Sequence, residues 1–261
     1  MPQKKEIMTI DLNCDMGEGM GRDEAIMPFI SSANIACGYH AGNRDSMIQT
    51  IELATQYGVS IGAHPSFPDK KNFGRIEMNM TASAIYELVA EQINILDDIA
   101  RSLGAALHHV KPHGALYNMA ARDIEMSATI AKAVKDYDSN LILFGLSGSY
   151  LVSEAKKAGL KTASEVFADR TYQDDGSLTS RSEANAMIEN PDDAVRQVLQ
   201  MIKEGFVTTV SGKKNSIVAE TVCIHGDGNH AAEFANRIHD ALKKEEINIC
   251  SISKKSGAVN E

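Results

Sequence analysis

The strongest constraint on the fold is a repeated alternation between short apolar runs and longer segments with helical period. Each apolar run is followed by a polar turn that contains glycine, and then by a segment whose apolar residues recur every three or four positions. The runs begin near Ile7, Ala33, Val59, Ala106, Leu141, Thr162 and Thr221, with a weaker one at Ile247. This order predicts strands that alternate with helices along the chain.

Start and stop signals support two of the predicted helices in particular. Thr81 can cap a helix that Gly104 ends, and Asn190 can cap another that Gly205 ends. Further amphipathic helices are predicted over residues 44–57, 124–135, 151–158 and 230–244.

Strands that alternate with helices form parallel sheets with helices on both faces. Seven or eight such units in one chain of this length fit a closed barrel better than an open sheet. We therefore predict an α/β fold, a TIM-like (β/α) barrel with seven main parallel strands. Residues 207–218 contain two β-rich runs around a polar turn and are predicted to form a hairpin that decorates the barrel. No linker composition divides the chain, so residues 1–261 are expected to form one domain.

Composition excludes several classes of partner. The chain carries 26 Lys and Arg residues against 35 Asp and Glu residues, without a basic block, so nucleic acid binding is not expected. The N-terminus reaches Asp11 before an apolar signal core could form, and the longest apolar run is too short to cross a bilayer. The four cysteines are dispersed, and three lie in strand-like runs, which predicts reduced core residues. We expect a cytoplasmic protein without a membrane partner.

Ionisable residues collect directly after nearly every predicted strand. Because the active sites of parallel α/β folds lie at the carboxyl ends of the strands, we expect these side chains to meet at one mouth of the barrel. In the first strand, period-two alternation places Asp11, Asn13 and Asp15 on one face, which would be the barrel interior. The candidates at or after the other strand ends are Glu18, His40, His64, Lys111, His113, Glu165, Asp169, Arg170, His225 and Asp227.

Each candidate also has a purely structural interpretation. A single His or Asp at a strand end is more often a cap or a hydrogen-bonded packing residue, and Asn43, His230 and His239 are interpreted in that way. Glu165 and Arg170 could form a plain buried ion pair. The number of charged residues argues for a site, because burying several charges without mutual compensation is costly.

The sequence leaves two interpretations open for the first histidines. Asp15, His40 and His64 could supply a carboxylate and two imidazoles to a divalent metal. Alternatively, the two histidines could hydrogen-bond a small polar substrate. The glycines at 17–21 lack the spacing of a dinucleotide fingerprint, and no phosphate-binding loop of the form G-x-x-x-x-G-K-[ST] occurs.

Six segments of the chain resemble motifs of the LamB/YcsF family, in this order and at these spacings. They are DLNCDMGEGMG, SSANIACGYHAGN, IGAHPSFPD followed by FGR, HVKPHGALYN, EVFADRTYQDDGSL and CIHGD. The resemblance spans roughly residues 7–252 and implies a seven-stranded (β/α) barrel akin to glycoside hydrolases and polysaccharide deacetylases.

The resemblance also implies an activity. It is the ATP-dependent opening of 5-oxo-L-proline, a cyclic amide, to L-glutamate by a bacterial 5-oxoprolinase. This hydrolase would require a complex of the present chain with two further subunits, B and C. Because the chain lacks a recognisable phosphate-cradling loop, ATP, with Mg, is expected to bind wholly or partly to the partner subunits.

Opening a resonance-stabilised lactam requires activation of its carbonyl oxygen, either by phosphorylation or by preorganised donors. Lys111, His113 and Arg170 are candidates for holding the substrate carboxylate and a developing or phosphorylated oxyanion. The residues expected to complete the substrate-binding mouth are Asp11, Asn13, Glu18, Asp169, Arg181, His225 and Asp227.

The acid–base roles have two candidates each. Asp15 or Glu165 would act as general base toward water. His40 or His64 would orient that water or protonate the departing nitrogen.

Two alternative functions stay open. The chain could be a metal-dependent deacetylase or hydrolase that acts alone, which metal analysis and turnover of acetylated sugars without ATP would reveal. It could also be a non-catalytic component that captures 5-oxoproline for its partners.

Overall fold

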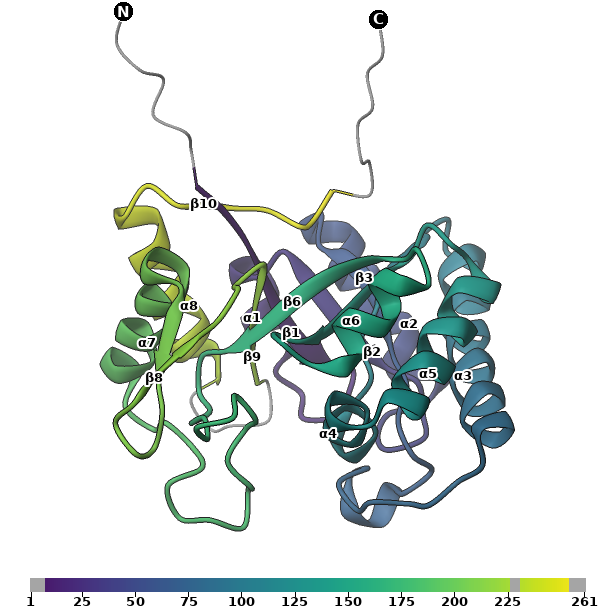
Figure 1. The fold of residues 1–261 in the computed structure, drawn as a ribbon. Coiled ribbons are helices and arrows are strands. Elements are labelled where there is room, and N and C mark those ends of the chain that lie inside the picture. Colours follow the sequence, from purple (N-terminus) through teal and green to yellow (C-terminus); the bar gives the residue numbers. More distant parts are fainter. Residues whose placement is uncertain (1–7, 226–230, 254–261) are drawn as a thin grey trace, which may run out of the picture.

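In the computed structural model, which describes residues 8–225 and 231–253, seven parallel strands close into a barrel (Figure 1). The strands are β1 (Thr9–Met16), β2 (Ser32–Ala36), β3 (Ser60–His64), β4 (Leu107–Val110), β5 (Ile142–Leu146), β6 (Lys161–Phe167) and β9 (Thr221–Ile224). They are hydrogen-bonded in this order, and β9 pairs with β1 to close the sheet. The predicted (β/α) barrel with seven main strands is confirmed, and each strand begins close to its predicted position.

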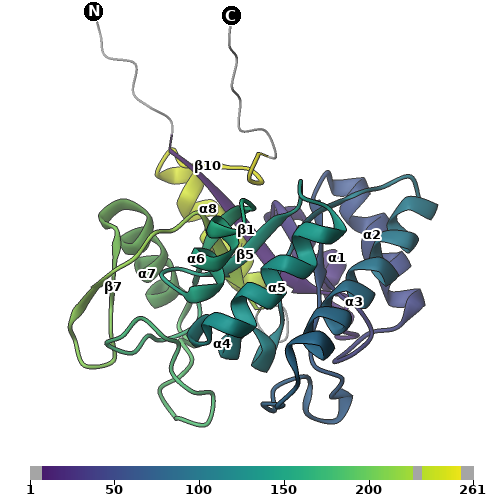
Figure 2. The same cartoon turned by 45° about the vertical axis from the view of Figure 1, so that its right-hand side comes forward.

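Helices surround the barrel on its outer face. They are α1 (Asp23–Ile26), α2 (Arg44–Tyr57), α3 (Ala82–Ser102), α4 (Gly114–Arg122), α5 (Ile124–Tyr137), α6 (Tyr150–Lys157), α7 (Pro191–Glu204) and α8 (Ala231–Lys244), with short 3-10 turns at Met27–Phe29 and Lys70–Asn72. Helix α5 packs against α3 and α6, and α7 packs against α8. Figure 2 shows α2, α3 and α5 following one another along one side of the molecule, with α7 and α8 on the other.

The predicted capping residues begin the helices as expected. Thr81 accepts a hydrogen bond from the Ala84 amide, and Asn190 accepts from the amides of Asp192 and Asp193. Asn43, also interpreted as a cap, begins α2 in the same way. The capping signals in the sequence are therefore correct at these three helices. His230 lies outside the described residues.

Two small β elements lie outside the barrel. Strands β7 (Phe206–Thr208) and β8 (Lys214–Ser216) form the predicted antiparallel hairpin. Strand β10 (Asn248–Ile249) pairs in parallel with the first residues of β1.

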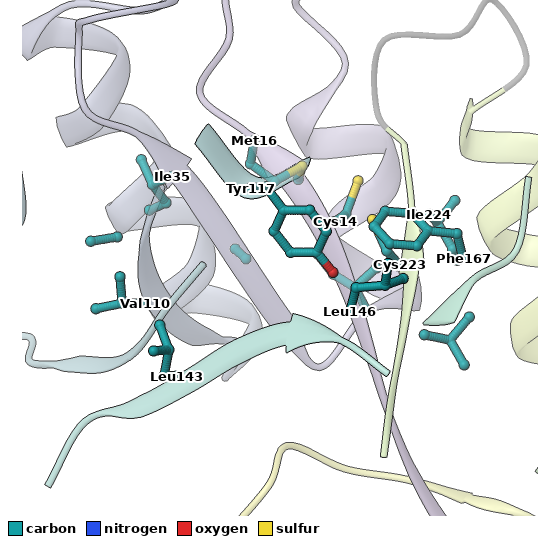
Figure 3. Close-up of a cluster of buried hydrophobic side chains, with 14 of the residues drawn as sticks. Cys14, Met16, Ile35, Val110, Tyr117, Leu143, Leu146, Phe167, Cys223 and Ile224 are labelled. Carbon is teal, nitrogen blue, oxygen red and sulfur yellow. The ribbon is translucent and has the colours of Figure 1, made fainter. Parts of the chain in front are cut away.

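The barrel strands divide their side chains between two environments. Along β1, the side chains of Leu12, Cys14 and Met16 join the hydrophobic core, whereas Asp11, Asn13 and Asp15 alternate with them. Figure 3 shows Cys14 and Met16 among other buried apolar side chains of this core. The polar face points into the barrel, because its side chains bond to polar side chains of other strands across the interior.

Three of the cysteines, Cys14, Cys37 and Cys223, are buried and free, as predicted, whereas Cys250 is free and exposed. Within the described ranges, no helix has the length and apolar character that a membrane span requires.

Candidate functional site

A cavity of about 910 Å³ opens at the carboxyl ends of the strands. Turns after the strands, helix α4, the first residue of α6, and the long segment after β6 form much of its walls. The predicted site residues that line it are Asp15, Glu18, His64, Lys111, His113, Arg170, Arg181 and His225. The structure therefore brings most of the predicted residues to one cavity.

The other predicted residues lie behind this lining. Asn13, His40, Glu165 and Asp169 are buried and bond to lining residues or to each other. Asp11, near the start of β1, is also buried and bonds to Ser31, Ser32 and Thr221. Asp227 lies outside the described residues.

Lys111 stands at the centre of a charged network on the cavity floor. Its Nζ lies 2.8 Å from Asp15 Oδ1, 2.9 Å from Glu165 Oε1 and 3.2 Å from Asn13 Oδ1, and only 2% of the residue is exposed. Burial opposes the charge, but the carboxylates of Asp15 and Glu165 raise the pKa of Lys111 well above its ordinary value. The ammonium group is therefore a permanent positive charge.

Asp15 is the carboxylate that this network exposes to the cavity. Its Oδ2 lies 3.3 Å from His64 Nε2, and its Oδ1 accepts a hydrogen bond from Asn34 Nδ2 at 2.9 Å. Burial alone would raise the pKa of Asp15, but the charges of His64 and Lys111 hold it well below its ordinary value. Asp15 is consequently ionised and only weakly basic.

Glu165 lies beneath Lys111. It accepts hydrogen bonds from Tyr117 Oη at 2.6 Å and from Asn13 Nδ2 at 2.9 Å. Within the described part of the chain, its ion-pair partner is Lys111 and not Arg170, so the alternative of a Glu165–Arg170 ion pair is not realised. The two side chains do not meet, because Glu165 points into the barrel from β6 whereas Arg170 lies beyond the end of that strand.

Arg170 anchors the long segment that follows β6. Its guanidinium donates to the carbonyl oxygens of Thr179 and Ala186. Burial, together with the nearby charge of Arg181, lowers the pKa of Arg170 to about 10, which still leaves it charged at neutral pH. The two arginines therefore give this wall of the cavity a positive charge.

Three imidazoles meet in the opposite wall. The rings of His40 and His113 are stacked with centroids 3.8 Å apart, and His64 meets both of them edge-on. Glu18 Oε1 lies 3.2 Å from His40 Nε2. Burial and the neighbouring imidazoles lower the pKa of His40 to about 3 and that of His113 well below its usual range, so both rings are neutral.

The turn after β3 makes room for these rings. Gly74 has a φ of +65°, and a Cβ at this position would lie 2.9 Å from His40 Cβ and 3.1 Å from His113 Cδ2. The Phe73 ring packs edge-on against both imidazoles, with its centroid 5.4 Å from each of theirs. The FGR motif therefore shapes the histidine cluster.

His225 and Asp169 form a further contact on the cavity wall, near the end of β9. His225 Nδ1 lies 2.8 Å from Asp169 Oδ1, and this partner lowers the pKa of Asp169 against the effect of burial. The pair thus joins the strand ends of β6 and β9 on the cavity wall.

Sequence reasoning missed several residues of the site. Asn34 links Asn13, Asp15 and His109, and it follows Ser32 by two positions on β2, so the period-two signal for an interior residue was present. Tyr117 lies on α4, a helix that was not predicted. Arg75 and Arg122 also line the cavity.

Among the residues that the structure describes, two groups of side chains have donor atoms close enough to share a metal ion. Glu18, His40, His64 and His113 form one group, and Asp15, Cys223 and His225 form the other, with all donor atoms of each group within 4.8 Å of one another. The predicted trio is thereby divided, because Asp15 belongs to the second group. The nitrogen and oxygen donors of the first group suit a divalent transition metal.

Comparison with known proteins gives a consistent family. A model of the LamB/YcsF family matches residues 10–257. The A subunit of a 5-oxoprolinase from Bacillus cereus (strain Q1) is 51% identical over 249 residues, which cover 93% of this chain and 98% of that protein. The protein of the same name from Tolumonas auensis is 52% identical over 92% of this chain and 98% of its own length.

Solved structures agree on the architecture. The Lactam Utilization Protein from Thermus thermophilus superposes with a TM-score of 0.87 at 40% identity, over 94% of this chain and 100% of that one. A T48 deacetylase superposes with a TM-score of 0.51 at 12% identity, over 95% of this chain and 90% of that one, a likeness of the fold alone.

Proposed function

The chain belongs to the LamB/YcsF family, and from this premise we propose that it is the A subunit of an ATP-hydrolysing 5-oxoprolinase. With subunits B and C it would open the lactam of 5-oxo-L-proline to L-glutamate in the cytoplasm. Relatives that share about half of their residues with this chain, over more than nine-tenths of it, carry that name.

The structural observation that carries the proposal is the pairing of one fixed cation with one ionised carboxylate at the cavity floor. Lys111 and Asp15 both line a cavity of about 910 Å³, a volume typical of small-molecule sites. Their contact at 2.8 Å places a donor for a carbonyl oxygen next to an acceptor for a water proton.

The roles follow from these positions. In ring opening, a water oxygen bonds to the lactam carbonyl carbon, the bond from carbon to the ring nitrogen breaks, and that nitrogen gains a proton. Lys111 would hold the carbonyl oxygen as it gains charge, and Asp15 would orient the water and receive its proton, with His64 positioning Asp15. Glu165 would position Lys111 from behind the lining.

The low basicity of Asp15 fits a reaction that consumes ATP. A carboxylate whose pKa is held well below its ordinary value is too weak a base to drive water onto an unactivated amide. Transfer of the γ-phosphoryl group of ATP to the carbonyl oxygen, with release of ADP, would supply the missing activation. Once water has added and the bond from carbon to nitrogen has broken, a second water would hydrolyse the resulting acyl phosphate to L-glutamate and inorganic phosphate. Arg75, Arg170 and Arg181 line the cavity and would bind the anionic groups of such an intermediate, with Mg-ATP held at least in part by the partner subunits.

The test is a reconstitution of the complex. This chain and purified subunits B and C are mixed with 5-oxoproline and Mg-ATP, each component is omitted in turn, and glutamate and ADP are followed together. We expect both products only when all three subunits are present. A complete mixture that releases no glutamate would overturn the proposal.

A substitution of Lys111 tests the assigned residue in the same assay. Lys111→Ala should lower glutamate release at least about 100-fold, because it removes the cation that faces the reacting oxygen. Lys157→Ala on the outer helix α6 is the matched control and should release glutamate at the unsubstituted rate.

Two further outcomes separate the alternatives. If Lys111→Ala and Asp15→Ala weaken substrate affinity but leave glutamate release at saturating substrate intact, the chain only binds the substrate for its partners. If the chain alone deacetylates acetylated sugars without ATP, it is a stand-alone hydrolase.

A further inference from the structure

We propose that Glu18, His40, His64 and His113 together form a binding site for one zinc ion in the wall of the cavity. This donor set replaces the Asp15, His40 and His64 trio that the sequence suggested. The inference concerns metal binding and does not depend on the proposed lactam activity, since the ion can be measured without substrate.

The outer nitrogens of two of the imidazoles show which nitrogens carry hydrogen. His64 Nδ1 lies 2.7 Å from the Lys111 carbonyl oxygen, and His113 Nε2 lies 2.9 Å from the Phe73 carbonyl oxygen. A carbonyl oxygen can only accept a hydrogen bond, so both outer nitrogens are donors. His64 Nε2 and His113 Nδ1 are then the ring nitrogens that are left to bind a metal ion.

The third imidazole is oriented in the same way. Ser66 Oγ, which donates to the Phe67 carbonyl oxygen at 3.0 Å, lies 2.9 Å from His40 Nδ1 and can accept a hydrogen bond from it. His40 Nε2 points toward Glu18 Oε1 at 3.2 Å, so this nitrogen and the carboxylate oxygen could bind the same ion. Such outer-shell acceptors, which fix the tautomer of a histidine, are a regular feature of protein metal sites.

The remaining ring nitrogens and the Glu18 carboxylate face one another. His64 Nε2 and His113 Nδ1 lie only 2.9 Å apart, and the Glu18 carboxylate, also an acceptor, lies 3.7 Å from His113 Nδ1. The donor atoms of all four groups lie within 4.8 Å of one another, so one metal ion between them could bind all four.

The distances match the expected geometry. Zinc bonds of roughly 2.0–2.1 Å to nitrogen and oxygen give a tetrahedron with edges of roughly 3.3–3.4 Å. Three of the six separations between donor atoms are 2.9 Å for His64–His113, 3.2 Å for Glu18–His40 and 3.7 Å for Glu18–His113, which lie on both sides of that value, and the other three are within 4.8 Å. Small shifts of the side chains would therefore complete the coordination.

The test measures zinc directly on the full chain. The purified protein is stripped with a chelator, titrated with zinc by calorimetry, and passed through a desalting column before its metal content is determined. We expect one zinc ion per chain. Cobalt added in place of zinc should give the intense visible absorption of a tetrahedral site, which also reports the geometry.

Variants then assign the donors. Glu18→Gln and His113→Ala should each weaken zinc binding at least about tenfold, and Ser66→Ala, which removes only the outer partner of His40, should weaken it less than either. His239→Ala on α8 is the matched histidine control and should bind as the unsubstituted chain does. Circular dichroism checks that each variant is folded, and Glu18→Gln keeps the size of the side chain.

Three results would overturn the proposal. The first is a stripped chain that takes up no zinc. The second is equal zinc affinity in Glu18→Gln, His113→Ala and the unsubstituted chain. The third is binding that His225→Ala abolishes while His113→Ala preserves it, because the ion would then occupy the group around Asp15 and Cys223.

Discussion

Position 62, in the middle of β3, has no room for a side chain. A Cβ on Gly62 would lie 2.1 Å from His109 Nε2, which is closer than any real contact of this kind. The His109 ring cannot move away easily, because it is fully buried, bonds to Asn34 Oδ1 at 2.8 Å and stacks on Phe144 with ring centroids 4.2 Å apart. Glycine here is a consequence of a bulky polar ring inside the barrel.

We expect Gly62→Ala to lower the free energy of unfolding by about 1–3 kcal/mol, the usual cost of overpacking a core. Urea unfolding measures this cost. The control is a double-mutant cycle with His109→Ala, which removes the ring that the new methyl group meets. If the cost of Gly62→Ala is the same in the His109→Ala background, the clash is not its cause.

Only part of the site could be predicted from the sequence. Asp15 and Lys111 were predictable because polar residues at strand ends of a parallel barrel converge. The sequence could not show that Asp15 and Lys111 face the cavity whereas Glu165 lies behind it. The position of a side chain near the end of a strand depends on its partners across the barrel. Here Tyr117 and Asn13 hold Glu165 behind the lining.

Among the elements, α7 depends on Asn190, the residue that caps its N-terminus. The Asn190 side chain accepts hydrogen bonds from the Asp192 and Asp193 amides, which would otherwise lack partners within the helix. Asn190→Ala should lower the free energy of unfolding by about 1 kcal/mol. Asn190→Asp keeps the accepting oxygen and should cost much less in the same urea titration. Equal losses in the two variants would show that the cap is not responsible.

Helix α4 shows where element prediction fails. It begins at Gly114, directly after Pro112 and His113, and the side chain at its N-cap position makes no capping hydrogen bond. The sequence there carries only turn signals, so the helix was hidden although its buried face includes Leu116 and Tyr117. Helices with side-chain caps, such as α2, α3 and α7, were predicted with nearly correct bounds.

The stability of the whole molecule depends on the seam where the barrel closes. Asp11 on β1 accepts hydrogen bonds from Ser31 and Ser32 at the start of β2 and from Thr221 at the start of β9. Burial raises the pKa of Asp11 from its ordinary value of 3.8 to about 6, although these three hydroxyl groups oppose the shift.

This shift gives the seam a pH dependence of known sign. Because the folded chain holds the Asp11 proton more tightly than the unfolded chain, the contribution is fully present below the unfolded pKa and is lost as pH rises through about 6. Relative to Asp11→Asn, the unfolding free energy of the unsubstituted chain should fall by up to about 3 kcal/mol between pH 4 and pH 7. Urea titrations across this range check the difference, and a constant difference would contradict the shift.

At the scale of the whole molecule, the regular alternation of predicted strands and helices was enough to predict the barrel and its seven strands. The polar interior was predictable only along β1, where Asp11, Asn13 and Asp15 alternate with apolar residues. The bonds across the barrel, such as Asn34 to His109, join residues far apart in sequence and follow from closure of the sheet.

The single exposed cysteine has a practical use. Cys250 follows β10 and donates its amide to the Ile10 carbonyl oxygen, near the beginning of β1 and therefore at the opposite end of the barrel from the cavity. Its three counterparts are buried. A maleimide dye should therefore label one defined position, from which the arrival of other subunits could be followed by fluorescence without blocking the mouth.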